Sequence, residues 1–410
     1  MKNGYRVPGE FEKQESVLTV WPVEEWAAKG LEADAVSAEM VEYLAGNVKV
    51  MVVCYSEAVM ERAKRKISAT GTDISLIDFR LHPIDNPYPR DFGAEILVHE
   101  NGRKKLADFR FAEYCFIPGD HSYSFGIGMR TFNRYHAEIA GIKEKEKTWI
   151  FSEGGDREFN GQGVMMAIED TEVRKRNPGK TKKMVEEEFK RLLHLEKIIW
   201  IPRCSYDDEN MLDGTIPGPD GKPAYRSATA NGHIDEMCRF VSEDTILMAS
   251  VTEEEAAAGE LARLNKERLD EAYEVVSQAT DITGKPFRIV KMPVPEPIFI
   301  EVGPEEHAWQ GLEHFTRALG GKMLDGTPFP TGKITVLPAL SYCNFLITNN
   351  LVIAQRYWQE GMPEIVRAKD KLALDTLISL FPERKVMALP TLALNMLGGG
   401  IHCHTRNIPL

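Results

Sequence analysis

The stretch DREFNGQGVMMAI (residues 156–168) decides the fold, together with the two stretches that follow it, KKMVEEEFKRLLHL (182–195) and KIIWIP (197–202). Asn160-Gly161 separates two short strand-like runs and predicts a tight hairpin turn. Apolar residues at helical spacing in the second stretch indicate an amphipathic helix, and the third is typical of a short strand. We therefore expect one unit of hairpin, helix and strand.

The same order of elements recurs at a period of roughly 80 residues. A second unit begins at CRFVSEDTILMASV (238–251) and a third at NFLITNNLVIAQ (344–355), each followed by a helical stretch and a strand. An earlier hairpin, AEILVHENGRKKLADF (94–109), shows no clear helix after it, and the N-terminal part predicts a helix near 35–44 and a strand at 48–55. These units predict one large ring-like α/β domain, with an ordinary two-domain α/β protein as the alternative.

Two stretches without a periodic pattern interrupt this order, at residues 205–230 and 293–338. The first contains PGPDGKP (217–223), a composition typical of loops. Loops of this length are usually lids, binding loops or insertions. We expect both to be long loops.

Composition excludes several classes of partner. The chain has 50 Lys plus Arg and 62 Asp plus Glu, a net charge of −12, which disfavours nucleic acid or an anionic membrane surface and favours a cationic small molecule. The N-terminus shows no apolar signal-peptide core, and no apolar run approaches the roughly 18 residues of a transmembrane helix. Six cysteines without a CxxC motif predict a reducing, cytoplasmic location.

Short polar motifs precede the hairpins at equivalent positions. They are PYPRDFG (87–93), SEGGD (152–156), NGHIDEM (231–237) and SYCN (341–344), and GGGIHCHT (398–405) lies near the C-terminus. If the units are related by rotation, these points converge near one axis. The residues then expected in one pocket are Asp91, Glu153, His233, Asp235, Asn344 and Cys403.

Cys403 is the candidate nucleophile. It follows three glycines, which permit close backbone approach. A lone cysteine is more often an inert buried residue, but the polar flanks favour a reactive thiolate. His402 and His404 alternate around Cys403, so on an extended segment they would point to the opposite face, which disfavours a zinc site made of the three.

His233 and Asp235 are two residues apart, so a strand would place both side chains on one face. A carboxylate beside an imidazole holds the protonated ring that a general acid requires, although a purely structural pair has the same pattern. Asp91, Glu153 and Asn344 have structural alternatives too: a surface pair with the preceding arginine, a turn cap and a hairpin-edge amide. No single motif decides the function.

Together these residues form a set of carboxylates with one histidine and one cysteine. Clustered carboxylates repel one another unless a cation neutralises them. A guanidinium fits this demand because it donates several hydrogen bonds in one plane. Cysteine would then attack the guanidinium carbon while histidine transfers protons, and no metal or organic cofactor is needed.

These motifs resemble the agmatine deiminase and bacterial peptidyl-arginine deiminase family of guanidine-modifying enzymes. The resemblance covers most of the chain and includes VWPVEEW (20–26), KIIWIPR (197–203) and LFPERKV (380–386). It implies an α/β fold, the five-bladed pseudo-symmetric α/β propeller called the pentein fold. It also implies one catalytic domain over residues 1–410, with insertions near 205–230 and 293–338.

The resemblance assigns roles to individual residues. Cys403 matches the nucleophile, His233 the general acid/base, and Asp91 and Asp235 the catalytic carboxylates that bind the guanidinium. The implied activity is a cysteine-dependent hydrolase of linear amidines, which forms a covalent amidino-cysteine intermediate and releases ammonia and a ureido product. An amidinotransferase with the same intermediate is the alternative, and a catalytically inactive pentein binding protein is a further one.

Four further positions match substrate-binding residues of the family or depart from them. Glu153 matches the Glu-Gly-Gly glutamate, and Asn344 matches the pocket asparagine. Tyr88 stands where agmatine deiminases usually carry Trp. ADFRFAEY (107–114) replaces a Trp- and Asn-containing segment that contacts the far end of the substrate, and there Arg110 would either bind a substrate carboxylate or form a structural salt bridge.

The implied partner is a small cationic guanidine of polyamine or arginine metabolism. We expect no nucleic-acid or membrane partner and no metal or cofactor. A homo-oligomer in the cytoplasm is compatible with the resemblance. The sequence leaves agmatine, arginine and peptidyl arginine open as substrates.

Overall fold

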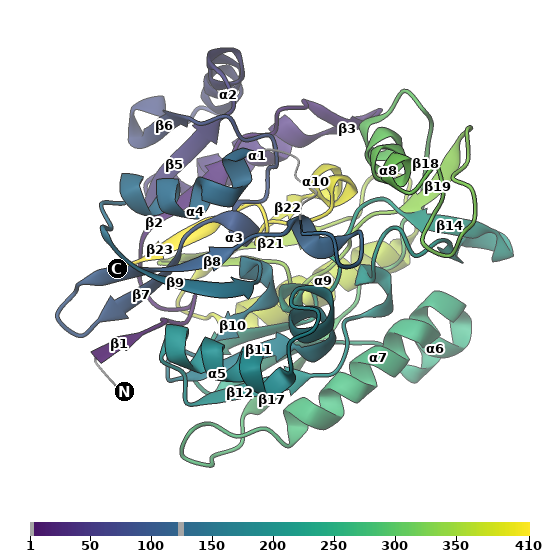
Figure 1. Ribbon diagram of the computed structural model, residues 1–410. Helices are drawn as coiled ribbons and strands as arrows, with labels where there is room; N and C mark the ends of the chain where they lie inside the picture. Colours follow the sequence, from purple (N-terminus) through teal and green to yellow (C-terminus); the bar gives the residue numbers. More distant parts are fainter. Residues whose placement is uncertain (1–3, 122–126) are drawn as a thin grey trace.

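The computed structural model describes residues 4–121 and 127–410. These residues form six sheets of three or four strands and a two-stranded ribbon, with helices packed around them (Figure 1). The predicted mixed α/β class is therefore confirmed. No helix within the described ranges is long and apolar enough to cross a bilayer.

The quoted stretch folds as predicted. Strand β10 (Glu158–Phe159) pairs antiparallel with β11 (Val164–Ile168), and β12 (Lys197–Ile201) joins β11 in parallel after helix α5 (Lys182–Leu193). Asn160 closes the hairpin because its Oδ1 accepts hydrogen bonds from the backbone N–H groups of Gln162 and Val164. Gly161 occupies the left-handed region that the turn requires, with φ of 72°.

Two later units repeat the same strand order, with antiparallel pairing in the hairpin and a parallel third strand. In the first of them the predicted helix is divided at Gly259, which is extended with φ −155° and ψ 143°. The elements of these two units are β15 (Cys238–Ser242), β16 (Thr245–Ser250), α6 (Glu253–Ala258), α7 (Glu260–Ser277) and β17 (Arg288–Pro293), then β20 (Leu346–Thr348), β21 (Leu351–Arg356), α9 (Glu364–Leu380) and β22 (Lys385–Pro390).

The earlier hairpin does have a helix after it, contrary to the sequence prediction. Tertiary contacts hold this helix: Asn133 donates to Asp108 Oδ1 at 2.9 Å, and Phe132 is buried in the core. The elements of this sheet are β1 (Tyr5–Arg6), β7 (Glu95–His99), β8 (Lys104–Arg110), α4 (Ile127–Ile139) and β9 (Glu144–Phe151).

A fifth sheet joins the two ends of the chain (Figure 1). Its C-terminal strand pairs antiparallel with the strand near the N-terminus, which in turn pairs in parallel with the next strand across a helix. The strand that follows Cys403 is thus fixed on the N-terminal part. The elements are β23 (Arg406–Pro409), β2 (Gln14–Val20), α1 (Ala33–Leu44), β5 (Lys49–Cys54), α2 (Glu57–Ala69) and β6 (Ile77–Leu81).

The two stretches expected as long loops instead contain strands that pair with each other. Tyr225 in the first pairs with Val336 in the second, in parallel register. The strands are only two to four residues long, so their pairing depends on distant partners rather than on a local pattern. The elements of the two stretches are β13 (Ile216–Pro217), β14 (Pro223–Arg226), β18 (Ile300–Val302), α8 (His307–Ala318) and β19 (Ile334–Leu337), and the ribbon elsewhere is β3 (Trp26–Ala28) with β4 (Leu31–Glu32).

Candidate active site

Cys403 lies in the turn between helix α10 (Leu392–Leu397) and β23, and only 1 % of its surface is exposed. Asn344 holds it from two sides: Oδ1 accepts the Cys403 N–H at 3.1 Å, and Nδ2 donates to Sγ at 3.0 Å. Gly399 must be a glycine because a Cβ there would lie 3.2 Å from Sγ and 3.0 Å from the Tyr88 ring. The glycine run therefore lets the backbone approach the thiol.

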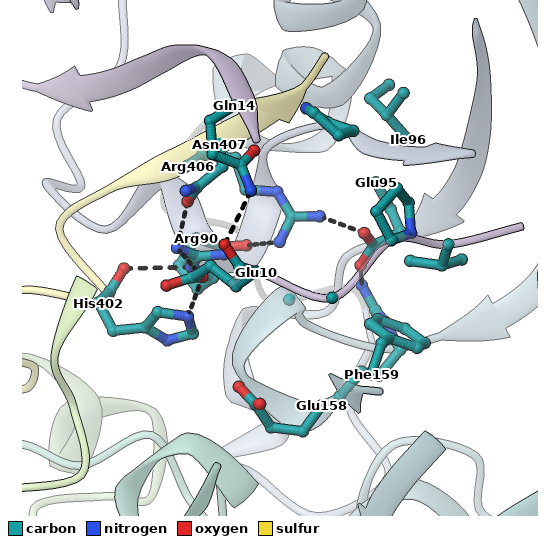
Figure 2. Close-up of a pocket in the computed structure, with 16 residues that line it drawn as sticks. Glu10, Gln14, Arg90, Glu95, Ile96, Glu158, Phe159, His402, Arg406 and Asn407 are labelled. Atoms are coloured by element: carbon teal, nitrogen blue, oxygen red, sulfur yellow. Dashed lines mark hydrogen bonds and ion pairs between the residues drawn. The ribbon is translucent and has the colours of Figure 1, made fainter. Parts of the chain in front are cut away.

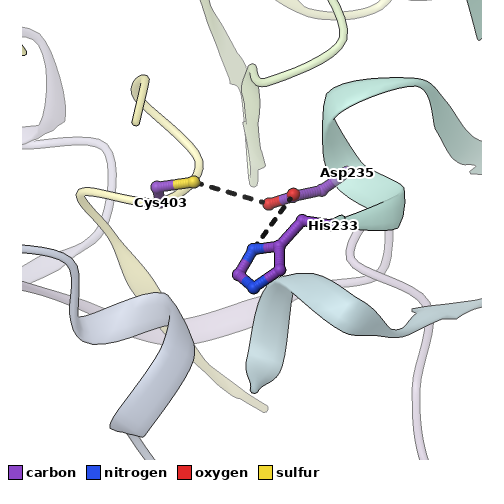
Figure 3. A group of neighbouring side chains, drawn as sticks. All are labelled: His233, Asp235 and Cys403. Atoms are coloured by element: carbon purple, nitrogen blue, oxygen red, sulfur yellow. Dashed lines mark hydrogen bonds and ion pairs between the residues drawn. The ribbon is translucent and has the colours of Figure 1, made fainter. Parts of the chain in front are cut away.

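His233 and Asp235 do not lie on a strand, contrary to the sequence prediction. His233 precedes a short 3-10 turn, Ile234–Glu236, and Asp208 Oδ2 accepts its backbone N–H at 2.8 Å. The two side chains still face one space. His233 Nδ1 is 3.8 Å from Asp235 Oδ1, and Asp235 Oδ2 is 3.8 Å from Cys403 Sγ (Figure 3).

Asp91 and Glu153 each approach one ring nitrogen of His233. Asp91, on the short helix α3 (Pro89–Phe92), has Oδ1 at 3.6 Å from His233 Nδ1. Glu153 Oε2 is 3.8 Å from His233 Nε2. A Cβ on Gly155 would collide with the His233 ring, which explains the glycine after Glu-Gly in this motif.

The six residues expected in one pocket are thus brought together, whereas the two remaining predicted positions differ. Tyr88 is buried beside Gly399, and its hydroxyl donates to the Leu394 carbonyl at 2.7 Å. Arg110 is exposed at the end of β8, with its guanidinium 5.6 Å from the Phe151 ring centre. No carboxylate of the described residues forms an ion pair with Arg110, and its role in binding a substrate carboxylate stays a prediction.

His402 does not point away from Cys403, as an extended segment would require. The segment 401–404 is a turn, and His402 Nδ1 lies 2.5 Å from Asp235 Oδ2. His404 does turn elsewhere, with Nε2 at 2.9 Å from Ser37 Oγ and Nδ1 at 2.6 Å from the Pro87 carbonyl. His402 is therefore part of the site, which the sequence pattern did not show.

The surrounding charges set the protonation of the two central groups. Burial alone would lower the pKa of His233, but Asp91, Asp156, Glu153 and nearby carboxylates outweigh it and hold the pKa well above its ordinary value. His233 is therefore an imidazolium. Burial raises the pKa of the Cys403 thiol, and the charges of the neighbouring carboxylates raise it further, so the empty site holds a protonated thiol.

The environment moves the pKa values of the carboxylates in different directions. Burial raises the pKa of Asp91. Burial also acts against ionisation of Asp235, but the hydrogen bond and charge of His402 outweigh it and lower its pKa. Glu153 pairs with the buried Arg176, which lowers its pKa to about 2, whereas burial raises the pKa of Asp156 to about 7.

Sequence reasoning missed several members of this network. Glu236 accepts from Asn344 Nδ2 at 2.9 Å and lies 3.8 Å from Cys403 Sγ. Tyr114 donates to Asp91 Oδ2 at 2.9 Å. Glu236 and Asp156 stand inside the motifs NGHIDEM and SEGGD and could have been found there, whereas Arg176 and Asp208 lie outside every motif.

Four buried polar atoms in this space have no hydrogen-bond partner among the described residues. They are both ring nitrogens of His233, Oδ1 of Asp235 and Oδ1 of Asp156. Buried polar atoms in folded proteins are normally paired. The space between His233, Asp235 and Cys403 therefore has the donors and acceptors of a ligand site.

A metal ion is the first ligand to consider here. Donor atoms of His233, Asp235 and Cys403 lie within 4.8 Å of one another. One oxygen of Asp235 is already bonded to His402, which leaves that carboxylate a single oxygen for any ligand. We interpret the group as a site for an organic cation, and the absence of a metal requirement stays a prediction.

A larger pocket of about 500 Å³ lies on the other side of Tyr88 and Tyr114. Helix α8 and the segment before α3 form part of its wall. Its described lining contains the carboxylates Glu24, Asp85 and Glu113 but no Lys or Arg. Its apolar lining residues are Phe116, Met129, Met211, Phe315, Met396 and Leu397.

The fold and the site define a class: mixed α/β proteins in which a thiol, an imidazole and carboxylates from separate motifs converge on one buried space. The chain belongs to the Porphyromonas-type peptidyl-arginine deiminase family, whose sequence profile matches residues 6–217 and 221–409. The predicted family is therefore confirmed, and a deiminase activity follows from it at the level of the family.

Relatives span the whole chain. Proteins named "Putative agmatine deiminase" from Marinomonas sp. (strain MWYL1) and Streptococcus mutans are each 25% identical to it; the alignments cover 99% and 100% of this chain and 95% and 96% of the relatives. The agmatine deiminase of Enterococcus faecalis shares the fold with a TM-score of 0.75 at 23% identity, over 100% of this chain and 96% of that one.

Proposed function

We propose that this protein is a cysteine-dependent deiminase that converts a guanidine to a ureido product and ammonia. The observation that carries the proposal is the buried space beside Cys403, where Asp235 Oδ1 and the His233 ring nitrogens have no hydrogen-bond partner among the described residues. An unpaired carboxylate oxygen matches a guanidinium N–H, and the thiol lies 3.8 Å from the other oxygen of the same carboxylate.

Substrate binding would prepare the nucleophile. Asp91 and Asp235 bind the guanidinium N–H groups and hold the carbon near Sγ at the roughly 3–3.5 Å of a near-attack geometry. The substrate charge offsets the carboxylates that raise the pKa of Cys403, so the thiol proton is lost to solvent when the cation enters. The thiolate forms only in the loaded site.

The chemistry then follows two steps. The thiolate sulfur bonds to the guanidinium carbon, His233 gives its proton to the departing nitrogen, and the C–N bond breaks to release ammonia. Neutral His233 next takes a proton from water, whose oxygen bonds to the same carbon. The C–S bond breaks, which restores the thiolate and leaves His233 as the imidazolium, and the protonated ureido product then loses its extra proton to solvent.

The proposal extends to the architecture. Five sheets share one order, an antiparallel pair followed by a parallel strand across a helix, and the fifth joins the chain ends. We propose that they are the blades of a five-bladed α/β propeller within a single domain of residues 1–410. The sheet of β13, β14, β19 and β18 would be an insertion at its edge.

The pocket favours an agmatine-like substrate over arginine. Its described lining offers carboxylates for a second positive charge and no Lys or Arg for a substrate carboxylate. Arg110 does not line this pocket. We therefore propose that the substrate is a small cationic guanidine of polyamine or arginine metabolism. The reaction needs no metal or cofactor. The proposed location is the cytoplasm, where the protein could form a homo-oligomer.

Ammonia release by purified protein tests the function, with agmatine, free arginine and a peptide ending in arginine as substrates and Cys403→Ser as control. Activity on agmatine above the other two, with and without a chelator, supports the proposal. Turnover that requires an added amine would identify an amidinotransferase instead. No turnover and no alkylation of Cys403 by 2-chloroacetamidine would identify an inactive binding protein.

A further inference from the structure

A second buried cluster of charges lies behind the thiol-bearing turn, around a cavity of about 60 Å³ (Figure 2). His402 connects this cluster with the active site. Its Nδ1 lies 2.5 Å from Asp235 Oδ2, and its Nε2 lies 2.7 Å from Glu10 Oε2. Only 2 % of the His402 side chain is exposed.

The two contacts determine the protonation of His402. Ionised carboxylates accept hydrogen bonds and cannot donate them. Two bonds to ionised carboxylates therefore require a proton on each ring nitrogen. Glu10 is held in its ionised form: burial opposes this, but His402, Arg90 and Arg239 outweigh it and lower its pKa well below the ordinary range.

Neighbouring contacts fix the position of this chain of groups. Glu10 Oε2 also lies 3.0 Å from Arg90 Nη2, and Glu10 Oε1 accepts the Ile347 N–H at 2.8 Å. The Arg90 backbone N–H and side-chain Nε donate to the carbonyls of Cys403 and His402 at 3.2 and 3.1 Å. Glu10 and Arg90 thus hold the turn on which both His402 and Cys403 stand.

The bond to His402 leaves Asp235 with one free oxygen. Oδ2 is occupied, whereas Oδ1 is buried, has no partner and faces His233 at 3.8 Å. An imidazolium at Oδ2 favours the ionised carboxylate, and the fixed bond directs the remaining oxygen toward the substrate space.

We propose that His402, supported by Glu10, is a positioning residue that keeps Asp235 ionised and turns its Oδ1 toward the guanidinium. The inference rests on the proposed function and adds residues to it, because His402 and Glu10 do not touch the substrate. The other ionisable groups around this chain are Asp91, Glu236, His233, Cys403, Arg90, Arg239 and Glu158.

The test compares His402→Gln with wild type in two readouts. The first is the pH profile of kcat/KM for ammonia release from agmatine. Loss of the cation beside Asp235 raises the pKa of that carboxyl, so the acidic limb moves to higher pH by about 1–3 units, with a larger rise in KM than fall in kcat. Activity recovers in part at alkaline pH.

The second readout needs no turnover. It is the ratio of two rates of Cys403 alkylation, one with the cationic reagent 2-chloroacetamidine and one with neutral 2-chloroacetamide. In both reactions the thiolate displaces chloride. Wild type prefers the cationic reagent, and His402→Gln loses at least about tenfold of this preference at pH 6. The conservative Glu10→Gln shifts both readouts in the same direction as His402→Gln, but by a smaller amount. If His402→Gln does not fold, Glu10→Gln alone still tests the inference.

His404→Gln is the matched control because it removes an equally buried imidazole from the same turn, one that binds neutral partners. Its acidic limb and reagent preference stay as in wild type. A wild-type-like profile and preference in folded His402→Gln and Glu10→Gln would overturn the inference. Wild-type protein without any preference for the cationic reagent would instead overturn the proposed function itself, and this inference with it.

Discussion

Two buried clusters of ionisable groups lie on either side of the turn 401–405, and they differ in how their charges are paired. In the cluster of Figure 2, every carboxylate oxygen of Glu10, Glu95 and Glu158 faces a donor. In the cluster around Cys403, whose side chains Figure 3 draws, both ring nitrogens of His233 and Oδ1 of Asp235 have no hydrogen-bond partner among the described residues. The paired cluster supports the structure, and the unpaired one is arranged for a ligand.

The largest expected effect comes from removing the nucleophile of the unpaired cluster. Cys403→Ser should lower kcat for ammonia release by about 10⁴-fold or more, because loss of a covalent catalyst removes the reaction path itself. Cys54→Ala, a buried cysteine on β5, is the control and should keep its activity. Activity of Cys403→Ser within tenfold of wild type would break the distinction between the two clusters.

Asp91→Asn should lower kcat/KM by about 10²–10³-fold, because an ionised partner of a buried cation is lost. The same change should raise the Tm of the unliganded protein at pH 8, on the order of 2–4 °C. The sign follows from linkage: burial raises the pKa of Asp91, so its ionisation above that pKa destabilises the folded state, and the amide removes this penalty. A lower Tm with unchanged kcat/KM would place Asp91 in the paired cluster.

Glu95→Gln should have the opposite stability effect. Glu95 pairs with Arg157 at 3.1 Å and with Arg406 at 2.9 Å, both buried, so its removal leaves two cations without their partner. We expect a loss of about 3–5 kcal/mol in the free energy of unfolding, measured by urea denaturation. The variant that folds at low temperature should keep the wild-type KM, and a tenfold change in KM would show that this cluster also binds substrate.

Arg110→Ala should have the smallest effect. Its side chain is exposed and lies over Phe151, outside the described lining of the large pocket. Rates with agmatine and with arginine should each stay within about twofold of wild type, the range of surface substitutions. A selective loss of arginine turnover would restore Arg110 as a carboxylate anchor.

Much of this arrangement could be predicted from the sequence, because Asp91, Glu153, His233 and Asn344 each stand in a short motif just before a hairpin. The turn signal Asn160-Gly161 and the helical spacing after it likewise defined the repeated unit. These signals are local, so a single sequence carries them.

What could not be predicted depends on contacts between distant segments. His402 was placed on the wrong face because alternation assumes an extended backbone, whereas the segment is a turn held by Arg90 and Asn344. The short strands of residues 205–230 and 293–338 pair only with each other, and their sequence shows no periodicity. Arg176, which pairs with Glu153, lies in no motif.

The most direct test of the account is intact-mass analysis of protein mixed with agmatine and quenched rapidly in acid. The account predicts a transient species heavier than the free protein by the mass of agmatine less ammonia, formed by wild type and absent in Cys403→Ser, with the modified peptide containing Cys403. Steady release of ammonia by wild type without any such adduct, or an adduct that persists in Cys403→Ser, would contradict covalent catalysis at this cysteine.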